Sequence, residues 1–125
     1  MSVDAWQPVP QITSIDSAAL ERLVSVAAQA AEGNLTTDLD WIQPFAQMNH
    51  SAWSPAIAQL DTEKMISLIK LFTMVEKQAG WDLAEKSAVI PLFKALRKEV
   101  GIDRALVQWV KDQSDNKYLP FGPLL

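Results

Sequence analysis

The chain has 125 residues, of which 49% are apolar and 21% charged; it has no cysteine and a formal net charge of −4. This composition excludes a disordered chain and a disulfide-stapled secreted domain, and it argues against a dedicated nucleic-acid-binding protein. Lys70 interrupts the richest apolar run, which argues against a membrane-spanning helix. We therefore expect one soluble globular domain over residues 1–125.

The charges are unevenly distributed along the chain. Residues 1–63 contain eight acidic residues and one basic residue, whereas residues 64–125 contain ten basic and seven acidic residues. Such asymmetry can mark an interaction surface, and it can equally reflect two halves that pack together. The N-terminus lacks the basic and apolar regions of a secretory signal, so the expected location is a bacterial-type cytoplasm.

The first part of the chain predicts an arm followed by a helix. Two closely spaced prolines favour an extended arm over residues 1–13, with Trp6 packing it against the helical core expected over residues 14–113. A helix is expected over residues 16–32, because apolar residues recur there at helical spacing and Gly33 follows.

The segment over residues 34–60 has the weakest periodicity. A helix over about 39–48 would place Pro44 in its first turn. Residues 49–51 are interpreted as a connection. A short helix is then expected over 54–60, with Ser54 as its hydroxyl cap and the following proline at the first helical position.

The clearest helix is expected over residues 62–79. Asp61 can cap its N-terminus and Gly80 can end it. Apolar residues cover a wide arc of this helix, and a helix that is apolar on so much of its circumference usually has neighbours on several sides. We therefore expect this helix to be central.

Two further helices are expected near the C-terminus. The first runs over about 88–100, with Ser87 as a candidate cap and an inward apolar stripe that ends at Val100. The second runs over 103–113. Ile102 precedes its aspartate cap, and Val107 follows that cap at the spacing of a hydrophobic staple.

The last residues, 114–125, are rich in both apolar residues and proline, which predicts an irregular tail packed on the bundle. No segment shows the period of two that indicates a strand. The predicted fold is therefore all-α, a compact bundle of five or six helices with an extended N-terminal arm.

No motif reaches the specificity of a catalytic or metal site. His50 is the only histidine, and no glycine-flanked nucleophile accompanies it. Residues 67–70 and 114–117 match Ser-x-x-Lys, but the chain lacks the other elements of the enzymes that use it. No metal-ligand spacing or phosphate-binding glycine loop is present. The sequence therefore predicts no cofactor and no metal, and it favours a non-enzymatic protein.

Glu76 is an anomaly because helical geometry places it inside the apolar arc of the helix over 62–79. A buried carboxylate must be paired or have its pKa raised. One hypothesis is a proton-handling or ligand-anchoring acid in a small-molecule pocket that includes His50. The preferred interpretation is that Glu76 reaches solvent near the helix end or pairs with Lys94 or Arg97.

A basic face is expected on the last two helices, over residues 94–111. Two helices joined through a glycine can form a DNA-binding unit, although the spacing here fits that unit poorly. The residues of this candidate basic face are Lys94, Arg97, Lys98, Arg104 and Lys111.

The five tryptophans are too many for a domain of this size to bury completely, and Trp is enriched at binding hot spots. We therefore expect a non-enzymatic interaction or adaptor module that binds a protein partner or forms a homodimer, with no membrane contact. A small-molecule binder near Glu76 and a DNA-associated regulator are the alternatives. The candidate interaction surface comprises Trp6, Trp41, Trp53, Tyr118, Phe121 and Leu125.

Overall fold

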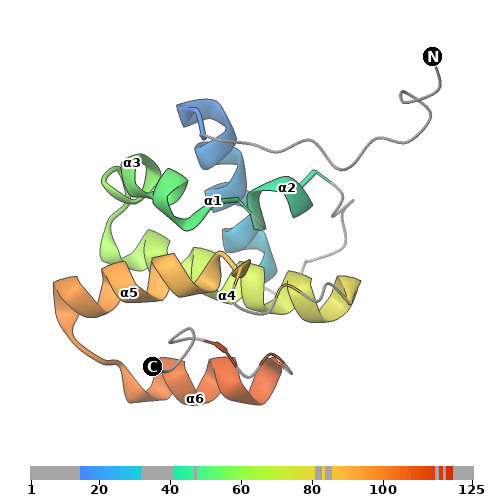
Figure 1. Ribbon diagram of the computed structural model, residues 1–125, viewed down its shortest axis with the longest axis vertical. Helices are drawn as coiled ribbons and strands as arrows, with labels where there is room; N and C mark the ends of the chain where they lie inside the picture. Colours follow the sequence, from blue (N-terminus) through green and yellow to red (C-terminus); the bar gives the residue numbers. More distant parts are fainter. Residues whose placement is uncertain are drawn as a thin grey trace.

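The computed structural model describes residues 15–31, 41–46, 48–80, 83, 86–114, 116 and 118–119, and these are arranged as an all-α bundle (Figure 1). The arm expected over 1–13 and the end of the tail lie outside the described residues. Within the described ranges every regular element is a helix, and none is long and apolar enough to cross a membrane. The elements are α1 (Ser17–Ala31), α2 (Gln43–Ala46), the 3₁₀ helix η2 (His50–Trp53), α3 (Ser54–Ile57), α4 (Thr62–Ala79), α5 (Val89–Val100) and α6 (Arg104–Gln113).

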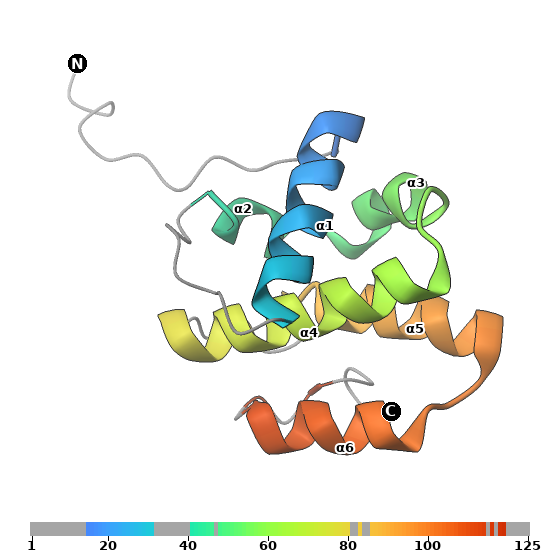
Figure 2. The same cartoon turned by 180° about the vertical axis from the view of Figure 1, so that it is seen from behind.

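Helix α4 is the centre of the bundle, as the sequence predicts. It packs against α1, α5 and α6, and the two views from opposite sides show α5 antiparallel beside it and α6 below it (Figures 1 and 2). Its buried residues occupy several sides of the helix rather than one stripe, which a helix with neighbours in several directions requires. They are Met65, Leu68, Ile69, Leu71, Phe72, Thr73, Val75 and Glu76.

The ends of α4 are set by the two residues that the sequence indicates. The side chain of Asp61 accepts a hydrogen bond from the backbone N–H of Lys64 at 2.8 Å, which satisfies one of the unpaired donors of the first turn. Gly80 adopts φ 73°, a left-handed conformation that side chains with a Cβ rarely adopt. Both ends of the central helix are therefore encoded locally.

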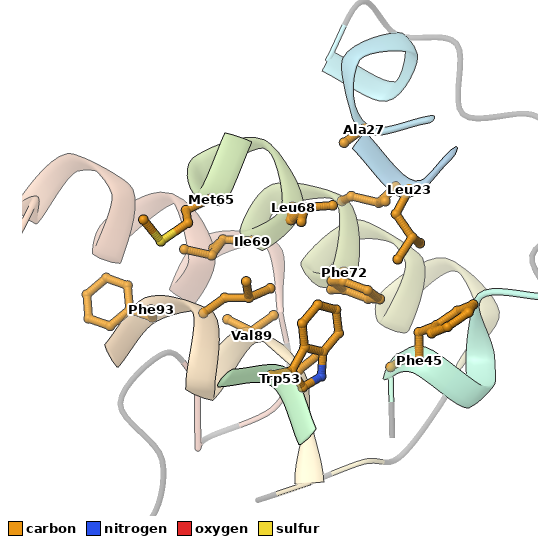
Figure 3. Packing of buried hydrophobic residues seen from close by; sticks show 14 of the residues in the cluster. Leu23, Ala27, Phe45, Trp53, Met65, Leu68, Ile69, Phe72, Val89 and Phe93 are labelled. Atoms are coloured by element: carbon orange, nitrogen blue, oxygen red, sulfur yellow. The ribbon is translucent and has the colours of Figure 1, made fainter. Parts of the chain in front are cut away.

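The segment before α4 differs from the prediction. Residues 50–53, of which 50 and 51 are expected to be a connection, form η2, which Asn49 caps by accepting from the N–H of Ser51. The predicted cap at Ser54 is wrong, because Ser54 is the first residue of α3 and that helix has no side-chain cap. Trp53, the last residue of η2, is buried, and its ring packs edge-on against Phe72, with centroids 5.5 Å apart (Figure 3).

Leu119 connects the residues after α6 to the core. Its side chain is buried in the same apolar cluster as the helices, while Tyr118 packs partly buried against that cluster. The described part of the segment over 114–119 therefore lies on the bundle, in agreement with the prediction for the start of the tail.

Replacement of Phe72 by alanine tests the central position of α4. Phe72 is fully buried and contacts Trp53, so Phe72→Ala should lower the free energy of unfolding by ~3–5 kcal/mol. Met74→Ala on the same helix is the control, because Met74 is only partly buried, and it should cost about 1 kcal/mol. Urea denaturation followed by tryptophan fluorescence measures both. Equal costs for the two variants would contradict the central packing of Phe72.

Candidate functional site

Glu76 lies in the last turns of α4 and is only 4% exposed. It faces the residues that lead into α5, where the hydroxyl of Ser87 donates a hydrogen bond to its Oε2 atom. The Ser87 oxygen also accepts from the backbone N–H of Val89 at 3.2 Å. The N-cap of α5 is Ala88, and it makes no side-chain cap hydrogen bond, so the predicted cap at Ser87 is wrong. The hydroxyl of Ser87 instead joins the residues just before α5 to α4.

Burial raises the pKa of Glu76 from its ordinary value of 4.5 to about 7, because the ionised carboxylate loses its hydration. Hydrogen bonding from the side chains of Ser87 and Asn116 opposes this rise by favouring the charged form. Asn116 lies beyond α6, so one carboxyl group joins α4, the entry to α5 and the segment after α6. The sequence analysis predicted neither partner. One signal was present: Glu76 lies near the end of α4 and Ser87 just before α5, so the connection between the two helices brings them close.

The preferred interpretation of Glu76 was therefore wrong. Glu76 does not reach solvent, and Lys94 and Arg97, its expected partners, are exposed along α5 rather than near Ser87. The reason is tertiary: in the α4–α5 pair, Glu76 meets the first residues of α5, whereas both cations lie one to three turns further along that helix.

Two other polar atoms are buried in this part of the core. His50 Nε2, Trp53 Nε1 and Glu76 Oε1 have no hydrogen-bond partner of normal geometry among the described residues. Figure 3 shows the Trp53 nitrogen on the side of the ring nearer Phe45. In the described ranges no group of three potential metal ligands occurs, and no hydrogen bond joins His50 to Glu76.

The structure divides the candidate interaction surface. Trp53 is fully buried and cannot contact a partner, which corrects the prediction for this residue. Trp41 is half-buried, with the guanidinium of Arg22 on α1 3.9 Å from its ring centroid and Phe45 packed edge-on against it. Tyr118 is also half-buried, whereas Trp6, Phe121 and Leu125 lie outside the described residues.

Trp109 serves a similar structural purpose on α6. The ammonium group of Lys70 on α4 lies 5.4 Å from its ring centroid, and Leu106 and Val110 on the same helix are buried. A cation over an aromatic face adds attraction to the apolar contact. Both described, half-buried tryptophans therefore join helices, which leaves less of them available to a partner.

The connection between α5 and α6 carries the most exposed large apolar side chains of the described residues. Val100 is 57% exposed and Ile102 is 55% exposed. The sequence placed Val100 on the inward stripe and Ile102 in a staple with Val107, so the exposure of both was missed. The candidate basic residues Lys94, Arg97, Lys98, Arg104 and Lys111 are all exposed. Arg97 and Lys98 in the last turn of α5 and Arg104 at the start of α6 adjoin this connection, whereas Lys111 lies in the last turn of α6.

Glu76 predicts a dependence of stability on pH. Because its folded pKa lies above its unfolded value, it favours the folded state below about pH 4.5, and this stability is lost as the pH rises through 7. Glu76→Gln keeps the shape without the charge. Its free energy of unfolding relative to the parent should increase by about 3 kcal/mol between pH 4 and pH 8. Chemical denaturation at a series of pH values measures this difference in unfolding free energy between variant and parent.

The control is Glu63→Gln, an exposed change on the same helix. Its difference in unfolding free energy from the parent should vary much less with pH. A difference for Glu76→Gln that stays constant with pH would refute the burial effect.

Ser87 predicts a shift in the same titration. Its hydrogen bond favours the ionised carboxylate, so Ser87→Ala should raise the pKa of Glu76 above about 7. The loss of this buried hydrogen bond should also lower stability by about 1–2 kcal/mol. Carbon-detected NMR titration of the Glu76 carboxyl measures the first effect directly, and an unchanged or lowered pKa would contradict the assigned bond.

Comparison of the chain with family models, with curated proteins and with solved structures gives no match. The function must therefore be inferred from the contacts, burial and charges of the chain's own residues.

Proposed function

We propose that the protein is a non-enzymatic interaction module that binds a protein partner at the α5–α6 corner, defined here as residues 97–104. The observation that carries the proposal is the exposure of Val100 and Ile102, two large aliphatic side chains, beside several cations. Isolated exposed apolar residues are common on protein surfaces. Here two exposed aliphatic side chains lie together on a short connection and have charged residues beside them. Protein interfaces use the same arrangement, an apolar centre with a polar border.

The small-molecule alternative receives less support. The carboxyl group of Glu76 already has a structural explanation, since it connects α4 with Ser87 and Asn116. A carboxylate that holds three segments together has a reason to be buried without a ligand.

The DNA-binding alternative draws on the same cations but does not explain the aliphatic pair. Affinity for phosphates comes from Lys and Arg side chains, and Val100 and Ile102 contribute nothing to it. The negative net charge of the chain also opposes association with a polyanion.

Site-specific photocrosslinking, carried out in the cells that express the protein, tests the proposal. A benzoylphenylalanine in place of Ile102 should yield a discrete crosslinked protein species, whereas the same group in place of Gln29, exposed on α1, should not. Val100→Ser in the Ile102-labelled chain should reduce that yield several-fold, because the apolar contact is lost, while stability changes by no more than about 0.5 kcal/mol. The absence of any product from position 102, or the same products from both positions, would refute the α5–α6 corner as the interaction site.

A further inference from the structure

We propose that the residues that follow α6 act as a pH-operated latch: ionisation of Glu76 releases them from the bundle and exposes the apolar side chain of Leu119. The C-terminal latch is defined here by its described residues, Ser114, Asn116, Tyr118 and Leu119. Its opening is a local movement, separate from unfolding of the whole bundle and independent of the interaction proposed at the α5–α6 corner.

The carboxyl group of Glu76 is buried where three segments meet. Its side chain is 4% exposed, and the hydroxyl of Ser87 donates to its Oε2 atom. Its Oε1 atom is also buried and has no hydrogen-bond partner of normal geometry among the described residues. A buried carboxylate needs several donors to replace the water that it has lost. These surroundings therefore favour the neutral acid, and ionisation favours any opening that admits water to the group.

Asn116 connects the C-terminal latch to this carboxyl group. Its backbone N–H donates to the hydroxyl of Ser114 at 3.0 Å, its Oδ1 accepts from the N–H of Tyr118 at 3.0 Å, and its carbonyl oxygen accepts from the N–H of Leu119 at 3.1 Å. Because Oδ1 is already engaged, the amide NH₂ is the group that can donate to Glu76. The same residue thus closes the turns of the C-terminal latch and provides its polar contact with α4.

The C-terminal latch is the part of this junction that the core holds least firmly. In the C-terminal latch, Leu119 alone is buried among the described residues, while Ser114, Asn116 and Tyr118 are half-buried. Local opening costs least where few apolar contacts are lost. Water therefore reaches Glu76 by displacement of the C-terminal latch rather than of α5. The buried residues that hold α5 in place are Val89, Ile90, Leu92, Phe93 and Leu96.

The direction of the response follows from the pKa of Glu76 in the closed and the open form. Burial raises this pKa to about 7 in the closed form and outweighs the hydrogen bonds from Ser87 and Asn116. Hydration in the open form lowers the pKa towards its ordinary value of 4.5. The neutral acid at low pH therefore favours the closed form. The open fraction increases as the pH rises from the lower pKa to about 7, and above 7 it levels off.

The charged groups around this junction do not account for the raised pKa of Glu76. Within the described part of the chain, the pKa is set by burial and by hydrogen bonds from two neutral side chains. The titratable groups of the surrounding elements are exposed, except for His50, which no hydrogen bond joins to Glu76. Asp82, Glu85, Asp115 and Lys117 belong to the same connections but lie outside the described residues. The described groups are His50 in η2, Lys77 on α4, Lys86 before α5, Lys94 on α5, and Lys111 and Asp112 on α6.

Amide hydrogen exchange of Tyr118 and Leu119 tests the C-terminal latch, because both N–H groups are bonded to Asn116 in the closed form. Their protection factors, corrected for the ordinary effect of pH on exchange, should fall at least ~10-fold between pH 5 and pH 8, which corresponds to a difference of about one unit between the two pKa values. The fall should level off above the pKa that NMR measures for the Glu76 carboxyl. Constant protection, or a carboxyl that does not titrate in this range, would overturn the inference.

Neutral variants identify the group that responds. Glu76→Gln should keep both protection factors within about twofold over the same pH range. The controls are Asp112→Asn, an exposed change on α6, and Asp115→Asn, and both should retain the fall seen in the parent. Circular dichroism confirms that each variant is folded, and the carboxyl titration of the parent decides the question if Glu76→Gln does not fold. A fall that persists in Glu76→Gln, or one that disappears in either control, would assign the response to another group and refute the inference.

Urea separates release of the C-terminal latch from unfolding of the whole bundle. Local opening exposes little surface, so exchange at Tyr118 and Leu119 should depend only weakly on low concentrations of urea. Exchange at the amide of Phe93, a buried residue of α5, should rise steeply with urea, and its protection should be higher at every pH. Equal urea dependence at all three amides would show that the bundle opens as one unit and would overturn the latch.

Discussion

The burial of α4 on several sides is the constraint on which the rest of the structure depends. An 18-residue helix whose apolar side chains point in several directions cannot be stabilised by one neighbour. Helices α1, α5 and α6 each cover part of it, and η2 adds Trp53 against Phe72. Because apolar burial is the main favourable term in folding, the positions of the other elements follow from the shape of this one helix.

Glu76 is the exception within that apolar surface, and it shows how a polar group can specify an arrangement that apolar contacts alone leave less defined. Apolar packing fixes distances between helices better than it fixes their register, since similar side chains can replace each other along a stripe. A hydrogen bond from Ser87 to Glu76 has one geometry. It sets where α5 starts along α4 and therefore where α5 ends, at the expense of a carboxyl group with a raised pKa.

The α5–α6 corner follows from that register. Since α5 begins opposite Glu76, its last residue lies past Met65, and the inward stripe continues beyond the core. Arg97, Lys98 and Arg104 adjoin the uncovered side chains because only three residues separate the end of α5 from the start of α6. The Ser87 to Glu76 hydrogen bond lies at one end of the α4–α5 pair, and the candidate binding surface lies at the other end. The length of α5 determines how far that surface extends past the core.

The sequence by itself determined the fold class, the limits of α4, α5 and α6 and the caps at Asp61 and Asp103, because these depend on side chains within a few residues of the backbone groups that they satisfy. It also identified Glu76 as a polar residue on an apolar face and the exposed cations of residues 94–111. Only the tertiary structure decided that Glu76 bonds to Ser87, that Trp53 is buried, and that Val100 and Ile102 are exposed. Each of these depends on which residue of one helix stands opposite which residue of another. Periodicity reveals which face of a helix is apolar, but it does not reveal where along its length the neighbouring helix ends.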